Sequence, residues 1–306
     1  MIANALGPVF LLILIGVILR RLDFPGAAFW PGIERLTYYL AFPALLIHRL
    51  ALADFSEANF LAFFLVIGGS LCLVSALIWF LKNSLARNSA DFTSVFQGGI
   101  RFNTYIGLAA ASALFGDAGL VVAAIAVGIM IPLVNVLCIL TFALANEEQR
   151  LSLPGLIKGL VTNPLIIGCL AGITLNLTAI GLPGWTAEVL ARLGATALPL
   201  GLLAVGVALS LGTVKQDWLA ILNSSLLKFL ALPGAMLVLS SLFGLDAMSR
   251  QVLLLLACLP TASSAYILAR QLGGNAPMMA NIISAQSLLA FAVMPLWLSL
   301  GMSWFG

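Results

Sequence analysis

Charged residues are scarce in this chain, and their scarcity excludes most kinds of soluble protein. Only 8% of the 306 residues are charged, whereas 62% are hydrophobic, and the mean hydropathy is +1.14. A soluble domain carries about 25% charged residues. The sequence therefore predicts an all-α integral membrane protein. The net charge of +3 is small and no basic run is present, so we expect no nucleic-acid partner.

Carboxylates are missing from the interior of the apolar stretches. Intramembrane aspartyl proteases need paired aspartates, and proton relays and many sodium sites use intramembrane carboxylates. The sequence therefore disfavours an intramembrane aspartyl protease, a carboxylate proton relay and a carboxylate sodium site. The acidic residues, which lie at or beyond the ends of those stretches, are Asp23, Glu34, Asp54, Glu57, Asp91, Asp117, Glu147, Glu148, Glu188, Asp217 and Asp246.

Metal-binding side chains are equally sparse. The four cysteines, Cys72, Cys138, Cys169 and Cys258, lie singly in apolar stretches with no metal-ligand spacing. Any serine–histidine catalytic pair would need the only histidine, His48, and no serine stands out as its partner. We therefore expect no metal, no cofactor and no catalytic residue. We expect His48 to be an interface residue without a chemical role.

Long apolar runs dominate the chain instead. A spanning helix needs roughly 20 mostly apolar residues. The first run has no basic segment before it and no small-residue cleavage site, which favours a spanning helix over a cleaved signal peptide. The longest polar stretch, Asn146–Arg150, lies at the midpoint of the chain. Ten segments qualify as spans: residues 3–19, 34–51, 60–81, 94–115, 118–141, 156–175, 188–209, 218–243, 249–269 and 278–300.

The two halves of the chain share a pattern of prolines and glycines. Because each half holds five expected helices, an odd number, the second half must enter the membrane from the opposite side, as an inverted repeat. We expect a five-helix repeat at 1–145, a linker loop at 146–155 and a second five-helix repeat at 156–306. An offset of 156 residues matches Pro8 with Pro164, Gly16 with Gly172 and Pro43 with Pro199, an offset of 161 matches Asn103 with Ser264 and Tyr105 with Tyr266, and an offset of 163 matches Pro132 with Pro295.

The basic residues predict how the chain is oriented, since cytoplasmic loops carry an excess of lysine and arginine. With the N-terminus outside, nine basic residues fall on the cytoplasmic side and three on the outer side. We therefore expect a multi-pass protein of the cell membrane, of bacterial inner-membrane type, with both termini outside the cytoplasm. Arg101 and Lys228 fall inside the membrane, and we expect Lys228 to snorkel to the cytoplasmic surface.

Two of the apolar segments, the fourth and the ninth, are interrupted by polar residues. Irregular backbone at membrane depth survives only inside protein or beside a water-filled cavity. Two such breaks at corresponding places in two halves indicate the substrate site of a transporter. Pro260 removes a backbone donor, and neighbouring hydroxyls can replace lost backbone bonds. The expected substrate-binding residues are Arg101, Asn103, Thr104, Tyr105, Pro260, Thr261, Ser263, Ser264 and Tyr266.

Arg101 is the strongest single signal for a ligand. An unpaired guanidinium at this depth costs at least roughly 2.5–3.5 kcal/mol, and no acidic residue lies at its level. The side chain must therefore pair with carbonyls, water or an anionic ligand, or else snorkel to the cytoplasmic face. The start of a half-helix carries partial positive charge, so an anionic substrate is favoured over a cationic one. We expect Asn135, Asn163 and Gln286 to form interhelical hydrogen bonds.

Three stretches of the chain resemble the auxin efflux carrier family of membrane transport proteins: Leu40–Leu46, Arg101–Leu108 and Leu259–Ala269. The resemblance covers nearly the whole chain. It implies ten transmembrane helices arranged as a 5+5 inverted repeat, a fold shared with bile acid/sodium symporters, in which broken helices 4 and 9 cross. It also implies a transport domain of helices 3–5 and 8–10, and a scaffold of helices 1, 2, 6 and 7 that often forms a homodimer.

The resemblance also implies a class of substrate. Family members carry organic anions, such as auxin in plants and malonate or related carboxylates in bacteria. The asparagine of the family's first crossover maps onto Asn103, whereas this chain has Ser264 where the second crossover often has asparagine. That difference implies a weaker polar contact there, or a different substrate.

The expected function is therefore secondary active or facilitative transport of a small organic anion by alternating access, with the lipid bilayer as the other partner. The residues are also compatible with two other kinds of transporter: a sodium-coupled organic-anion symporter of the bile-acid type, and a ten-helix drug/metabolite exporter. A receptor without transport and an intramembrane enzyme are the least favoured readings.

Overall fold

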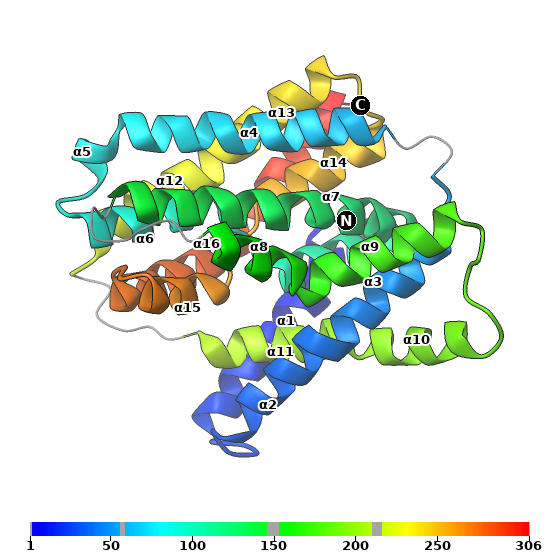
Figure 1. The fold of residues 1–306 in the computed structure, drawn as a ribbon. Coiled ribbons are helices and arrows are strands. Elements are labelled where there is room, and N and C mark those ends of the chain that lie inside the picture. The colour runs from blue at the N-terminus through cyan, green and yellow to red at the C-terminus, as the bar shows by residue number, and fades with distance from the viewer. Residues whose placement is uncertain (1, 56–58, 146–152, 210–215, 306) are drawn as a thin grey trace. The chain divides into compact units, whose positions relative to one another are not determined.

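The computed structural model describes residues 2–55, 59–145, 153–209 and 216–305. Every regular element in these ranges is a helix (Figure 1). Residues 146–152 of the predicted linker loop, 146–155, lie outside the described residues, and residues 153–155 are helical. The chain divides by packing into two compact units, each of which takes segments from both halves of the sequence. Unit 1 comprises residues 1–59, 105–131 and 157–208, and unit 2 comprises residues 60–104, 132–156 and 209–306.

The helices of unit 1 come first in each half of the chain. Their bounds are α1 (Ile2–Arg21), α2 (Phe29–Leu36), the π-helix η1 (Thr37–Ala41), α3 (Phe42–Ala51), α8 (Leu153–Val161), α9 (Pro164–Leu177), α10 (Thr186–Ala195) and α11 (Ala197–Ala208). The long α7 (Thr104–Ala145) contributes to both units, and α8 also begins in unit 2 and continues into unit 1. It is kinked at Gly116, where φ is 64°, between two of the predicted spans.

Unit 2 holds the remaining helices. Their bounds are α4 (Phe60–Phe80), α5 (Lys82–Leu85), α6 (Ser89–Ile100), α12 (Trp218–Leu226), the π-helix η2 (Leu227–Ala231), α13 (Leu232–Leu242), α14 (Ala247–Ala257), α15 (Ser264–Gln271) and α16 (Ala276–Phe305). Asn88 caps the start of α6 by accepting from the Asp91 amide, and Asp246 caps α14 by accepting from the Ser249 amide.

Helices suited to a membrane account for much of the described chain. Six helical stretches are long and apolar enough to cross a bilayer, and two shorter apolar helices, α9 and α14, accompany them. Each of the ten predicted segments overlaps one or more of the observed helices. Leu11, Leu14 and Ile18 lie exposed along α1, as expected for a helix that contacts lipid. The chain is an all-α integral membrane protein, and the ten-span inverted repeat stays a prediction.

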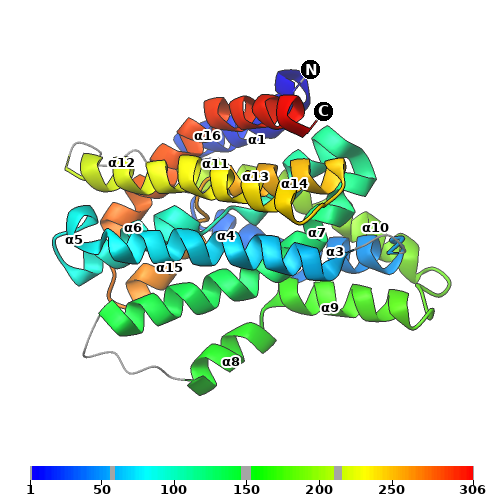
Figure 2. The same ribbon diagram turned by 90° about the horizontal axis from the view of Figure 1, so that it is seen from above.

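Unit 1 is assembled around two close helix pairs, α1 with α11 and α3 with α9. The α3–α9 pair lies side by side in both views (Figures 1 and 2). A Cβ added to Gly16 in α1 would overlap the Leu203 carbonyl oxygen of α11, and one added to Gly172 in α9 would lie 2.9 Å from the Leu50 Cβ of α3. Both pairs therefore depend on glycine, because any side chain would separate the backbones.

A proline shapes the centre of unit 2. Pro233 has no amide hydrogen and its ring obstructs the preceding turn, so the regular hydrogen-bond pattern of an α-helix is disturbed before it. The helix widens to η2 instead, and the Leu232 amide bonds to the Leu227 carbonyl five residues earlier. The Phe229 carbonyl would have bonded to residue 233. It accepts from the indole Nε1 of Trp297 at 2.6 Å.

The two predicted breaks are present, and both lie in unit 2. The first comprises Arg101–Asn103, between α6 and α7, and the second comprises Cys258–Ser263, between α14 and α15. The Asn103 amide donates to the Pro260 carbonyl at 2.8 Å, which joins one break directly to the other. Backbone groups that helix formation would have satisfied are thus satisfied between the breaks.

Candidate functional site at the helix breaks

The first break holds the guanidinium of Arg101 inside the protein. The residue is only 9% exposed. Its Nη2 donates to Asn135 Oδ1 at 2.7 Å and its Nη1 donates to Gln97 Oε1 at 3.3 Å. Neither acceptor is charged, and within the described ranges no carboxylate lies within ion-pair distance of the guanidinium. The arginine does not reach a surface, so the snorkelling alternative does not describe it.

Gln97 is the residue of this site that the sequence analysis missed. It is fully buried on α6, and in the described structure its Nε2 has no hydrogen-bond partner. One helical turn separates it from Arg101, a spacing that places two side chains on the same helix face. That spacing is the signal that points to it. Asn135 and Gln286 form the interhelical hydrogen bonds expected of them. The side chain of Asn163 instead caps its own helix, α9, by accepting from backbone amides of the first turn.

The second break is tied to the first by Thr261 and Gln286. The Thr261 hydroxyl lies 2.7 Å from Gln286 Oε1, 3.1 Å from the Gly98 carbonyl and 3.4 Å from the Arg101 carbonyl. A hydroxyl has one proton to donate, so these oxygens are alternative acceptors. The Thr261 amide also donates to Gln286 Oε1, and Gln286 Nε2 donates to the Gly98 carbonyl. Thr261 is fully buried, and its hydroxyl lies among protein acceptors in this conformation.

The other residues predicted for the site differ in exposure and location. Asn103 is buried, and Thr104 and Ser263 are partly exposed. Ser264, the first residue of α15, is exposed. Tyr266, one turn into α15, lies under the guanidinium of Arg270, whose Cζ is 5.9 Å from the ring centre.

Tyr105 is the one predicted site residue that belongs to unit 1. Its ring stacks on Phe42 with 4.5 Å between the ring centres. The structure therefore brings Arg101, Pro260 and Thr261 together with the Asn103 backbone, and leaves Tyr105 in the other unit.

Each break joins the end of one helix to the start of the next: α6 and α14 end there with partial negative charge, and α7 and α15 begin there with partial positive charge. These partial charges offset one another, so the net positive charge at the first break comes from the guanidinium of Arg101. In the described structure that guanidinium bonds only to neutral amides. A carboxylate or another anion is the ligand that such a site favours.

The prediction for Lys228 is wrong. The side chain does not snorkel to the cytoplasmic surface, because the residue is 0% exposed and its Nζ lies in the interior of unit 2. Lys228 follows the first residue of α12 by ten positions, which places it roughly 15 Å along the helix. Its ammonium cannot reach water from that depth. Within the described residues, Nζ has no hydrogen-bond partner.

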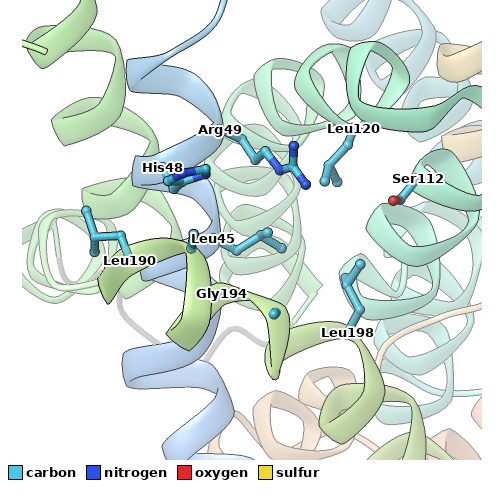
Figure 3. Close-up of a pocket in the computed structure, with 10 residues that line it drawn as sticks. Leu45, His48, Arg49, Ser112, Leu120, Leu190, Gly194 and Leu198 are labelled. Atoms are coloured by element: carbon cyan, nitrogen blue, oxygen red, sulfur yellow. The ribbon is translucent and has the colours of Figure 1, made fainter. Parts of the chain in front are cut away.

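A small pocket of about 120 Å³ lies in unit 1, between α3, α7, α10 and α11 (Figure 3). His48 and Arg49 enter it from α3, and Arg49 extends toward Ser112 and Leu120. The guanidinium of Arg49 forms an ion pair of 2.6 Å with Asp117. Because a carboxylate already neutralises this arginine, the pocket offers an anion much less than the breaks do. Nothing in it assigns chemistry to His48, whose role as an interface residue stays a prediction.

The sequence was compared with known proteins. Residues 1–298 match the family described as "Membrane transport protein". This chain belongs to that family. The family resemblance predicted from the residues is thereby confirmed, and transport is the activity that the family's description names.

Two relatives of this membrane transport protein match it over most of their length. One, from Methanothermobacter thermautotrophicus, is named "Uncharacterized transporter" and is 24% identical over 294 residues, covering 94% of this chain and 95% of the relative. The other, from Rhizobium meliloti, is named "Putative malonate transporter" and is 28% identical over 281 residues, covering 87% of this chain and 85% of the relative.

Proposed function

We propose that this protein is a secondary transporter that moves small organic anions, carboxylates of the malonate or auxin type, across the cell membrane by alternating access. One observation carries the proposal: a guanidinium is buried at a helix break, and in the described part of the chain its side-chain partners are the neutral amides of Gln97 and Asn135. A buried charge without a counter-charge is costly, and an anionic substrate would supply that counter-charge. The malonate named for the Rhizobium meliloti relative is the first substrate to test.

The proposed roles of the residues follow from their positions at the breaks. Arg101 attracts the anion, and Asn103 with the backbone around it binds a carboxylate. Ser264, exposed at the start of α15, completes the site. Pro260 keeps the second break from closing into a helix. Thr261 and Gln286 hold the two breaks in register through the Gly98 carbonyl.

The proposal includes ten spanning helices in two inverted five-helix repeats, with α6–α7 and α14–α15 as the broken, crossing helices. Contacts inside unit 1 support the repeat. At the offset of 156 residues, Gly16 corresponds to Gly172, and Ile47 and Leu50 correspond to Leu203 and Gly206. Gly16 of α1 packs against Leu203 and Gly206 of α11, and Gly172 of α9 packs against Ile47 and Leu50 of α3. Each contact is the counterpart of the other, as a twofold relation between the halves requires.

Both termini are proposed to lie outside the cytoplasm. Reporters fused after Gly306, one that is active only in the cytoplasm and one that is active only outside it, test this orientation. Activity of the outside reporter supports the proposed orientation. Activity of the cytoplasmic reporter would favour the ten-helix drug/metabolite exporter arrangement.

A thermal-unfolding screen against carboxylates tests the proposed function. A ligand that binds the folded state raises the unfolding midpoint. We expect malonate or a related mono- or dicarboxylate to raise the midpoint of the purified protein. Arg101→Ala and Asn103→Ala should abolish the ligand-induced rise. Arg192→Ala is the matched control, because this arginine is exposed and paired with Glu188, and it should respond as the unaltered protein does. An unchanged response in both Arg101→Ala and Asn103→Ala would refute the proposed site.

A further inference from the structure

The geometry points to a proton-binding site at Lys228, through which transport of the anion is coupled to movement of a proton. This inference rests on the proposed transport function and adds the ion that accompanies the substrate. Lys228 is fully buried in the middle of unit 2, on the π-helix η2. In the described part of the chain its Nζ has no hydrogen-bond partner. An ionisable side chain buried in a spanning segment without a partner calls for a functional explanation.

Among the described residues, the helices around Lys228 offer no counter-charge. η2 packs against α4, α6, α12 and α13. On these helices the titratable side chains are Cys72 of α4 and Asp91 of α6. Asp91 lies eight residues before Gly99, roughly 12 Å back along its helix, and it accepts hydrogen bonds from Asn88 and Asn275. Asp217, which precedes α12, accepts from Asn281.

The thiol of Cys258, the first residue of the second break, interacts electrostatically with Lys228. The first break is also close. A Cβ added to Gly99 would lie 3.4 Å from the Cβ of Leu227, and one added to Gly98 would lie 2.8 Å from the Cβ of Ser224. Gly98 and Gly99 thus allow the α12–η2 segment to pack directly on α6 just before Arg101. The lysine is therefore held against the ends of both broken helices.

This placement links the charge on Lys228 to the conformation of the breaks. An ammonium group in apolar protein without an acceptor is strongly disfavoured, so the conformation described here holds the neutral amine. In alternating access, water reaches the region of the breaks from each side in turn. Once water reaches Nζ, the amine can take up one proton. The protonated amine passes through the closed state while the bound carboxylate supplies the opposite charge, and it releases its proton to water when the site opens on the other side and the substrate leaves. Uptake forms one N–H bond and breaks one O–H bond of hydronium, and release reverses both changes.

The π-helix contributes to the coupling. A π-helix inside an α-helix is often found at a functional site, and here it results from Pro233 and is held by the bond from Trp297 to the Phe229 carbonyl. Because the π-helix carries both Lys228 and that carbonyl, a shift of the breaks that moves this turn changes the surroundings of the amine.

Liposomes containing the purified protein test the coupling with malonate as the probe. Exchange of labelled malonate against unlabelled malonate needs no net proton movement, whereas accumulation driven by an imposed pH gradient does. The unaltered protein should perform both, with proton flux reported by a pH-sensitive dye trapped inside. Lys228→Met should exchange malonate at a rate within about twofold of the unaltered protein, and its gradient-driven accumulation should fall to the level of empty liposomes. Lys158→Met, which removes an exposed lysine of α8, should retain both activities.

The other possible results contradict different parts of this account, and the assay distinguishes them. Gradient-driven accumulation by Lys228→Met equal to that of the unaltered protein would overturn it. So would exchange without gradient-driven accumulation in the unaltered protein, which would leave the proposed transport function standing. Absence of exchange in the unaltered protein would refute transport of malonate itself. A buried amine without partners also predicts that Lys228→Met folds with an equal or higher unfolding midpoint. A variant that fails to fold would contradict that premise.

Discussion

The two units differ in the surroundings of the basic residues discussed above. In unit 1, Arg49 pairs with Asp117 and Arg192 pairs with Glu188, and these ion pairs are accessible to solvent. In unit 2, Arg101 is buried against neutral amides and Lys228 is buried without a hydrogen-bond partner in the described structure. Exposed ion pairs and close glycine packing suffice to explain unit 1 as a stable framework. Unit 2 buries two basic side chains for which the described structure shows no counter-charge, and costly features of this kind make unit 2 the candidate for the functional site.

The largest expected effect concerns the packing of unit 1. Gly16→Ala places a methyl group against the backbone of α11 at Leu203, so α1 and α11 must separate, at a cost of about 2–3 kcal/mol of unfolding free energy. Gly7→Ala is the matched control in the same helix, since no atom lies within 4 Å of its added Cβ. It should be neutral or slightly stabilising. Unfolding of both variants by denaturant in detergent measures this difference. Equal unfolding midpoints for the two variants would contradict the close packing of α1 on α11.

The next effect separates stability from binding in unit 2. Asn135→Ala removes the nearer acceptor of the Arg101 guanidinium and should cost about 1–3 kcal/mol of stability, because a buried charge loses its partner. Arg101→Met removes the charge itself and should leave the midpoint unchanged or raise it. The double variant should be less destabilised than Asn135→Ala alone. If the changes in unfolding free energy of the two single variants add up to that of the double variant, the two side chains do not interact.

The smallest effect tests the π-helix of unit 2. Trp297→Phe keeps the aromatic bulk but removes the donor to the Phe229 carbonyl, which Pro233 leaves without a helical partner. We expect a loss of about 1 kcal/mol in unfolding free energy. Trp304→Phe, at an exposed tryptophan on the same helix, should cost much less. Equal unfolding midpoints for these two variants would show that the indole bond contributes nothing.

The sequence was sufficient to place the apolar segments and both breaks. The polar cluster that begins at Arg101 and the one that begins at Pro260 are unusual within apolar segments, so both interruptions could be predicted without coordinates. The offset of 156 residues identified Gly16 and Gly172 as counterparts, but it did not reveal that each lies against a different neighbouring helix.

What the sequence could not supply depends on tertiary packing. Gln97 has no distinctive local pattern, and its importance comes from facing Arg101 and from its unpaired amide. Lys228 was expected at the surface because a lysine in a spanning helix ordinarily reaches water. Its burial follows from η2 packing on α6, which requires the small residues Gly98 and Gly99. The π-helix likewise depends on Trp297, a partner 68 residues away in the chain.

The affinity of the protein for malonate, compared with that for the neutral diamide of the same shape, tests the central claim most directly. If the buried guanidinium at the break recognises negative charge, titration calorimetry should show binding of malonate and at least about tenfold weaker binding of malonamide, since a charge-assisted hydrogen bond contributes about 1.5–3 kcal/mol. Arg101→Met should lose that preference. Equal affinity for the two compounds, or an unchanged preference in Arg101→Met, would contradict the account.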